Sequence, residues 1–150
     1  RVQKFTFFDE FAKLFTAELK KHPDVIIHAA AVSDFRPRQK YPGKLSSDKP
    51  LKLVLVPTEK LIGRVKRLAP KTVLVGFKLE TTGCARHLRK AALDSIAENR
   101  CDLIVANSLT KGYRGFIFNQ EGALVAQATT REAMSRQLIA QLKRYDACPV

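Results

Sequence analysis

The sequence is poor in the residue types that mark several large classes of proteins. Its 150 residues include no tryptophan, one methionine and three cysteines, namely Cys84, Cys101 and Cys148. Three unevenly spaced cysteines exclude a disulfide framework and fit a reducing compartment. No apolar run approaches the roughly 18–20 residues of a membrane-spanning helix, and no signal-like segment opens the chain. We therefore expect a cytoplasmic location and no membrane partner.

The common motifs of catalytic and nucleotide sites are also absent. The chain has no Gly-x-Gly-x-x-Gly loop, no Gly-x-x-x-x-Gly-Lys-Ser/Thr loop and no Gly-x-Ser-x-Gly turn. Cys84 and His87 are three residues apart on a predicted helix, but two residues are too few for a metal-ligand set. We predict no metal site made of side chains. Cys101 is expected in the core.

Acidic residues are scarce, since 14 of them oppose 27 lysines and arginines, for a net charge of +13. The imbalance is concentrated in residues 36–72, where eleven basic residues oppose Asp48 and Glu59. Such a field attracts nucleotides, phosphorylated metabolites, nucleic acid or anionic lipid. A basic surface without any ligand has the same composition, so charge alone leaves both possibilities open.

Strand and helix patterns alternate, which indicates one layered α/β domain over residues 1–150 with a mainly parallel sheet. The expected strands and helices are separated by proline, glycine and charged residues. Helices are predicted over residues 8–19, 58–68, 83–99 and 129–145, and strands over residues 25–30, 51–56, 73–77, 102–107, 115–119 and 123–127. The last two strands form a hairpin followed by the final helix.

Three of these elements carry more specific expectations. The nearly continuous apolar run at residues 25–30 predicts a central strand covered on both faces, with His28 as a core residue. Thr6 followed by Asp9 and Glu10 resembles a capping signal for the first helix, and Thr129 with Glu132 forms a capping box for the last.

Residues 33–50 contain three prolines, one glycine and many charges, and we predict a basic flap there. Polar residues follow the apolar strands, where an open parallel sheet gathers its ligands. A crevice at that edge would bring together Asp34, Lys44, Phe77, Glu80 and Asn107. Since a lysine in a flap can neutralise a triphosphate, the residues alone predict a site for a phosphorylated ligand.

Three ordered blocks of sequence resemble one family. They are AAAVSDFRP at residues 29–37 followed by GKL at residues 43–45, VGFKLET at residues 75–81, and DLIVAN at residues 102–107 with the later pair GF. These blocks are similar to those of phosphopantothenate–cysteine ligases, also called phosphopantothenoylcysteine synthetases. The likeness extends over essentially the whole chain. It implies a Rossmann-like three-layer sandwich with a basic flap and a C-terminal hairpin plus helix.

The resemblance implies a ligase of coenzyme A biosynthesis that joins 4′-phosphopantothenate and cysteine. A nucleoside triphosphate, CTP or ATP, activates the carboxylate as an acyl-nucleotide with the help of Mg²⁺, and the cysteine amine then displaces the monophosphate. A homodimer is expected.

Carried over by position, the resemblance assigns nucleotide contacts to seven residues. Lys44 is the expected catalytic residue, which would hold the phosphates and assist activation. The expected nucleotide-binding residues are Ala29, Ala30, Ala31, Asp34, Lys44, Phe77 and Lys90. The position four residues after Lys90, basic in bacterial members, is Asp94 here.

The N-terminal half of the family, with its Gly-Pro-Thr turn and Ser-Ser-Gly phosphate loop, has no counterpart in the 150 residues, which begin at Arg1. We therefore expect a truncated domain that carries mainly the nucleotide side of the site and does not complete the ligation alone. Two alternatives stay open. One is a catalytically incomplete paralogue that binds nucleotide or a partner. The other, less favoured, is a basic nucleic-acid-binding domain, whose flap would offer only Phe35 and Tyr41 for stacking.

Overall fold

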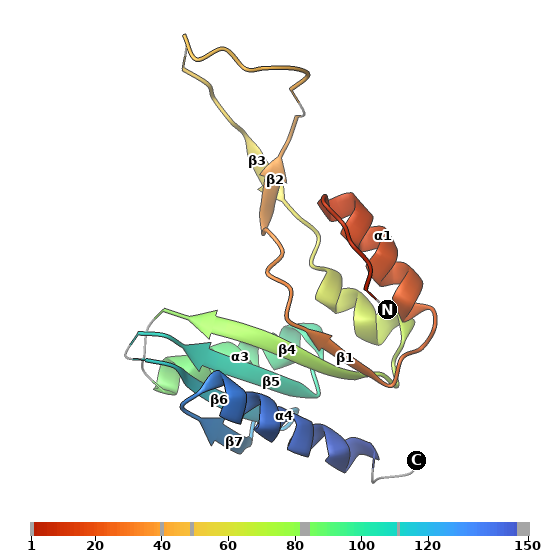
Figure 1. The fold of residues 1–150 in the computed structure, drawn as a ribbon, viewed down its shortest axis with the longest axis vertical. Coiled ribbons are helices and arrows are strands. Elements are labelled where there is room, and N and C mark those ends of the chain that lie inside the picture. The colour runs from red at the N-terminus through yellow and green to blue at the C-terminus, as the bar shows by residue number, and fades with distance from the viewer. Residues whose placement is uncertain (1, 40, 49, 82–84, 111, 147–150) are drawn as a thin grey trace.

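A computed structural model describes residues 2–39, 41–48, 50–81, 85–110 and 112–146. Its main sheet has five strands in the order β1-β4-β5-β6-β7 (Figure 1). Their bounds are Val25–His28 for β1, Val73–Glu80 for β4, Leu103–Ser108 for β5, Arg114–Asn119 for β6 and Leu124–Ala128 for β7. The first three strands are parallel, and β6 and β7 continue the sheet antiparallel.

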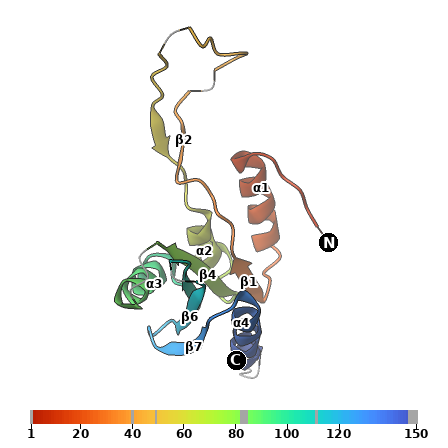
Figure 2. The same cartoon turned by 60° about the vertical axis from the view of Figure 1, so that its left-hand side comes forward.

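Helices cover both faces of this sheet, which confirms the predicted three-layer α/β architecture (Figure 2). One face packs against α1 (Phe8–Leu19), the 3₁₀ helix η1 (Leu61–Arg64), α2 (Val65–Leu68) and α3 (Ala85–Asn99). The other face packs against α4 (Arg131–Asp146). In the described residues, no helix has the length and apolar character needed to cross a membrane.

The two core clusters follow from the alternation of side chains along β4 and β5. Leu74 and Ile104 belong to the cluster under α3, whereas Val75 and Val105 belong to the cluster under α4. All four side chains are fully buried. The inward face of α4 has helical spacing, since Met134 and Leu138 are buried and Leu142 and Tyr145 pack against the same cluster.

Strand β1 corrects one prediction. It lies at the end of the described sheet and pairs with β4, and Ile27 is 51% exposed. The strongest contacts of α4 are with β7 and β6, at the other end of the sheet. Ile26, which points to the opposite face, does pack against the core. An apolar run therefore does not reveal whether both faces of a strand are covered.

The chain between β1 and η1 forms a long arm, defined here as residues 35–57. Its base is a two-stranded antiparallel ribbon of β2 (Phe35–Pro37) and β3 (Leu55–Pro57). The rest of the arm projects away from the sheet (Figures 1 and 2). The predicted flap is thus an extended arm, and the strand predicted over residues 51–56 is shorter and does not join the main sheet. Leu51, Leu53 and Val54 are exposed.

Helix ends were predicted less accurately than helix interiors. The N-cap of α4 is Thr130, whose Oγ1 accepts a hydrogen bond from the Ala133 N–H at 3.1 Å, one residue after the predicted cap. At α1, the Glu10 carboxylate accepts hydrogen bonds from the N–H groups of Thr6 and Phe7. Threonine side chains and glutamates near a helix start can serve as caps at several adjacent positions, so the sequence leaves this choice open.

One buried carboxylate ties the parallel strands together at their amino ends. Asp102, just before β5, accepts hydrogen bonds through Oδ2 from the Leu74 N–H at 2.6 Å and pairs with Lys66 Nζ at 2.7 Å. Lys66 also donates to the Thr72 carbonyl, and the Tyr145 hydroxyl donates to the Asp102 carbonyl. The two charged side chains are only 13% and 15% exposed. This network therefore links α2, β4, β5 and α4.

Asp102→Ala should lower the free energy of unfolding by about 3–5 kcal/mol, because it leaves the Lys66 ammonium group without its partner in a nearly buried position. Asp102→Asn should cost less, because the amide oxygen can still accept from the Leu74 N–H. The measurement is equilibrium unfolding by urea. Asp94→Ala is the control, since it breaks an exposed ion pair with Lys90 and should change stability by less than about 0.5 kcal/mol. Similar losses at both positions would show that the Asp102 network contributes little.

Candidate functional site

A cavity of about 690 Å³ lies at the carboxyl ends of the three parallel strands. This size is within the range of roughly 300–1,000 Å³ that is typical of small-molecule sites. Its walls come from the segment after β1, the segment between β3 and η1, the end of β4 and one face of α3. The position agrees with the general tendency of open parallel sheets to bind ligands at this edge.

Five of the seven predicted site residues meet in this cavity. They are Ala29, Ala30, Ala31, Asp34 and Phe77. The three alanines follow β1 without bulky side chains, so a ligand can approach the backbone there. Phe77 is 39% exposed and offers an aromatic surface. Glu80 and Asn107, which the sequence also placed at the crevice, line it too.

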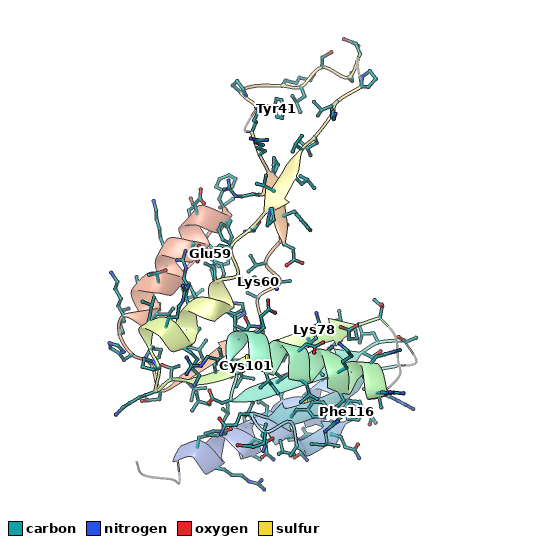
Figure 3. The ribbon with its side chains drawn as sticks, turned by 180° about the vertical axis from the view of Figure 1, so that it is seen from behind. Tyr41, Glu59, Lys60, Lys78, Cys101 and Phe116 are labelled. Carbon is teal, nitrogen blue, oxygen red and sulfur yellow. The ribbon has the colours of Figure 1, made fainter. Side chains whose placement is uncertain are left out.

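Lys44 and Lys90 do not line the cavity. Lys44 lies in the arm, near Tyr41, which Figure 3 places far from the cavity residues Lys60 and Lys78. Lys90 is on α3, where its Nζ pairs with Asp94 Oδ2 at 2.8 Å. Asp94 itself lines the cavity. The hydrogen bond with Asp94, and then its negative charge, raise the pKa of Lys90.

The cavity lining is acidic, although the chain is strongly basic. Among the residues that the structure describes, five carboxylates line the cavity against two lysines, Lys60 and Lys78. The carboxylates are those of Asp34, Glu59, Glu80, Asp94 and Glu98. A triphosphate in this cavity therefore needs cations beyond those two lysines, which a divalent metal or the basic arm can supply. In the described residues, no group of three or more His, Cys, Asp and Glu is placed to hold a metal ion; Cys84 is outside them.

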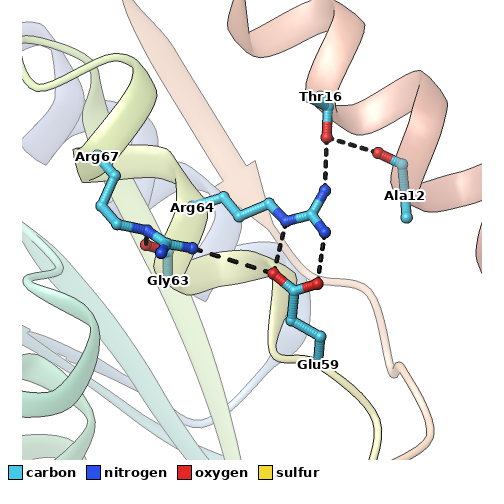
Figure 4. Close-up of polar contacts among 6 residues, drawn as sticks. All are labelled: Ala12, Thr16, Glu59, Gly63, Arg64 and Arg67. Atoms are coloured by element: carbon cyan, nitrogen blue, oxygen red, sulfur yellow. Dashed lines mark hydrogen bonds and ion pairs between the residues drawn. The ribbon is translucent and has the colours of Figure 1, made fainter.

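The sequence analysis missed the wall that residues 58–60 contribute, because we interpreted Pro57-Thr58 only as the start of a helix. A polar network holds this wall in place (Figure 4). Arg64 donates through Nε to Glu59 Oε1 at 2.7 Å and through Nη1 to Thr16 Oγ1 at 2.8 Å. The hydrogen bond from Arg64 is the main reason that the pKa of Glu59 is lowered. The wall is therefore attached to α1.

The same wall is attached to the segment after β1. The Thr58 N–H donates to the Asp34 carbonyl at 2.8 Å. The Thr58 Oγ1 is buried and has no hydrogen-bond partner in the described part of the chain. The α3 residues Ser95 and Glu98 line the opposite side of the cavity. A pair of polar residues after a short strand, followed by an apolar helix start, was the available signal for this wall.

His28 is a cavity residue, which corrects its prediction as a core histidine. It ends β1, is half-buried, lines the cavity and packs edge-on against Phe15 at 5.4 Å between ring centroids. Its Nε2 is buried without a hydrogen-bond partner among the described residues. Burial disfavours the imidazolium form and lowers the pKa of His28. Its ring is therefore neutral at pH 7.

Cys101, in contrast, is a core residue as predicted. It is 1% exposed, and burial raises the pKa of its thiol to about 12. The thiolate form is therefore negligible at neutral pH, and Cys101 has no nucleophilic role.

The protein should lose stability as the pH falls below about 6.5, the usual pKa of histidine. In that range the unfolded chain binds a proton at His28 that the folded protein disfavours, and the loss levels off once the pH is below the lowered pKa. His28→Leu should flatten the dependence of the unfolding free energy on pH between pH 7.5 and 5.5. The control is His87→Leu, which removes a histidine at an exposed position on α3. An unchanged slope in His28→Leu would refute this assignment.

Comparison with known proteins supports the family resemblance that the three motif blocks indicate. A family profile described as "DNA/pantothenate metabolism flavoprotein C-terminal domain" matches residues 8–144. The coenzyme A biosynthesis bifunctional protein CoaBC of Thermococcus kodakarensis is 47% identical over 102 residues, which are 67% of this chain and 25% of that protein. CoaBC of Methanocaldococcus jannaschii is 36% identical over 98 residues, which are 65% of this chain and 24% of that protein. The chain thus spans about a quarter of the length of these relatives.

Solved structures agree with the fold. The DNA/pantothenate metabolism flavoprotein from Streptococcus pneumoniae has a TM-score of 0.83 and 26% identity, over 95% of this chain and 72% of that one. A Cab2 mutant in complex with phosphopantothenate-cysteine has a TM-score of 0.70 and 22% identity, over 95% of this chain and 53% of that one, which shows a shared fold. The Rossmann-like fold and the family resemblance predicted from the sequence are confirmed. Since the family profile covers nearly all of the chain, the protein belongs to the family of DNA/pantothenate metabolism flavoprotein C-terminal domains.

Proposed function

We propose that the chain is the nucleotide-binding part of a phosphopantothenate–cysteine ligase in coenzyme A biosynthesis. The observation that carries the proposal is the convergence of Ala29, Ala30, Ala31, Asp34 and Phe77 in one cavity at the carboxyl edge of the sheet. These residues come from two motif blocks that are separated by about 40 residues of sequence. The CoaBC relatives, which are named for coenzyme A biosynthesis, support the same pathway.

In the proposed reaction, an oxygen of the 4′-phosphopantothenate carboxylate attacks the α-phosphorus of CTP or ATP. Pyrophosphate leaves and an acyl-nucleotide forms. The amine of cysteine then attacks the acyl carbon, the nucleoside monophosphate leaves with its bonding electrons, and the amine loses a proton. In this chain, Asp34 accepts hydrogen bonds from the ribose hydroxyls and Phe77 packs against the base. The backbone of residues 29–31 contacts the nucleotide closely.

The triphosphate is negatively charged, and the cavity lining has more carboxylates than lysines to meet it. The proposed site therefore needs further positive charge. Mg²⁺, when bound, neutralises part of the triphosphate, and the lining fits such an ion because hard cations bind phosphate oxygens, water and one or two carboxylates rather than a full protein cage. Lys44 supplies further charge in the proposal. Since Lys44 lies in the arm, the arm must bend toward the cavity, or the arm of a second copy must reach it. The proposed active form is a homodimer.

With Mg²⁺ present, CTP or ATP should stabilise the chain against unfolding by about 2.7 kcal/mol at 100 times the dissociation constant. Lys44→Gln should reduce this stabilisation at a fixed nucleotide concentration, because one charge is lost near the phosphates. Lys52→Gln is the matched control, as another exposed lysine of the arm, and should behave as wild type. The measurement is thermal or urea unfolding with CTP, ATP and GTP.

The competing functions predict different results in the same assay. A basic nucleic-acid-binding domain would be stabilised by RNA or DNA with steep salt dependence and by no single nucleotide. A paralogue without catalysis would bind a nucleotide but form no acyl-nucleotide with 4′-phosphopantothenate when the remainder of a CoaBC protein is supplied. Absence of stabilisation by CTP, ATP and GTP would contradict the proposal.

A further inference from the structure

The two lysines that line the cavity are not residues that the family motifs assign to the nucleotide. Both are paired with carboxylates that line the same cavity. Lys60 Nζ contacts Glu98 Oε1 at 2.8 Å, whereas Lys78 Nζ is 3.8 Å from Glu80 Oε1. Figure 3 shows Lys60 near the base of the arm and Lys78 on β4. Lys60 therefore has the closer ion pair, and it joins two opposite walls of the cavity.

The backbone around Lys60 is fixed, whereas its side chain is accessible. Thr58 is hydrogen-bonded to the segment after β1, and Glu59 is held by Arg64. The Lys60 carbonyl accepts a hydrogen bond from the Gly63 N–H at 3.3 Å. The side chains of Lys60 and Glu98 are 58% and 56% exposed. The ammonium group can thus change its partner without any movement of the main chain.

Negative charge surrounds this ammonium group on two sides. The hydrogen bond with Glu98, then the charge of Glu98, and to a smaller extent that of Asp34 raise the pKa of Lys60. Lys60 is therefore fully charged at neutral pH and is close enough to Asp34 to feel its carboxylate. Asp34 is the residue that the motif places against the nucleotide sugar, so Lys60 is positioned next to the part of the ligand that carries the phosphates.

An exposed ion pair such as Lys60–Glu98 is weak, because water competes with both partners. A phosphate group carries more charge than a carboxylate and accepts stronger hydrogen bonds from an ammonium group. A nucleotide phosphate that enters the cavity can therefore displace Glu98, which is free to turn toward solvent. We infer that Lys60 binds a phosphate group of the nucleotide and that Glu98 holds Lys60 in place until the nucleotide arrives. This inference rests on the proposed function, because it places the nucleotide in this cavity.

The inference predicts that Lys60 and Glu98 have opposite effects on the binding of phosphorylated ligands. Lys60 attracts the ligand, whereas Glu98 competes with it and repels its phosphates. Loss of the Lys60 ammonium group should weaken binding of phosphorylated ligands and spare the nucleoside, which has no phosphate. Loss of the Glu98 charge should strengthen binding of phosphorylated ligands. An ion pair with only a structural role would give changes of the same sign in both variants.

The test is isothermal titration of the chain with cytidine, CMP, CTP, the adenosine series and inorganic tripolyphosphate, in Mg²⁺ buffer. Lys60→Gln should weaken CTP or ATP binding by about tenfold and leave nucleoside binding unchanged, a difference that corresponds to about 1.4 kcal/mol. Glu98→Gln should tighten nucleoside triphosphate binding several-fold. The control is Lys21→Gln, because Lys21 is 61% exposed and pairs with Glu18 at 2.6 Å but does not line this cavity. It should bind as wild type.

The remaining outcomes distinguish failure of the inference from failure of the proposed function. Equal weakening by Lys60→Gln and Glu98→Gln would overturn the inference in favour of a structural brace. Nucleotide binding that is unchanged in Lys60→Gln would overturn it while the proposed function stands. Lys60-dependent binding of tripolyphosphate without preference for a nucleotide would support the phosphate site and contradict the proposed function. If the wild-type chain binds none of the phosphates, both are contradicted. Unfolding midpoints of all three variants should match wild type, since the three side chains replaced are exposed.

Discussion

The ion pair between Lys66 and Asp102 determines where the site can form. It fixes the start of β5 beside the start of β4 and attaches α2 to both strands at their amino ends. With this end fixed, β4 and β5 end in register, with Glu80 opposite Ser108. The segment after the shorter β1 and the carboxyl-terminal part of β4 line the cavity. A buried pair of this kind is costly to desolvate, so its value lies less in net stability than in the arrangement that it enforces. The opposite edge is then free to carry exposed polar and aromatic residues, such as Asp34 and Phe77.

Much of the fold was predictable because it depends on local patterns. The helical spacing of apolar residues predicted α1, α3 and α4, and the apolar runs predicted β4 and β5 close to their observed bounds. The Gln-Glu-Gly turn gave the hairpin, where Gly122 adopts a φ of +75° that favours glycine. Predictions failed where the answer depends on neighbours distant in sequence. Ile27 is an example, since the apolar run of β1 does not reveal that one of its faces is exposed. The cap of α4 failed for a local reason, since Thr130 serves in place of the adjacent Thr129.

In the candidate site too, features that follow from local sequence patterns were predictable, and features that depend on distant neighbours were not. Ala29, directly after β1, and Phe77, within β4, lie in one cavity, as the predicted strand order and polarity imply. His28 was misassigned, since the sequence shows an apolar strand but not that its last residue faces a cavity beside Phe15. Lys60 was missed altogether. It lies in a basic stretch where nothing in the sequence separates a cavity lysine from lysines of the arm, and only its contact with Glu98, 38 residues later, reveals its position.

Net charge proved a poor guide to the electrostatics of the cavity. The chain carries +13, yet its cavity lining holds more carboxylates than ammonium groups. The two facts are compatible because much of the basic excess lies in residues 36–72, many of which belong to the arm. At the Debye length of about 8 Å that applies at physiological ionic strength, charges along the projecting arm act on approaching ligands but are largely screened from the cavity. Attraction of an anion and its selection are thus separate tasks. In the proposed function, the arm raises the local concentration of phosphorylated molecules, and the acidic cavity favours those that bring a metal ion or displace a carboxylate from a lysine.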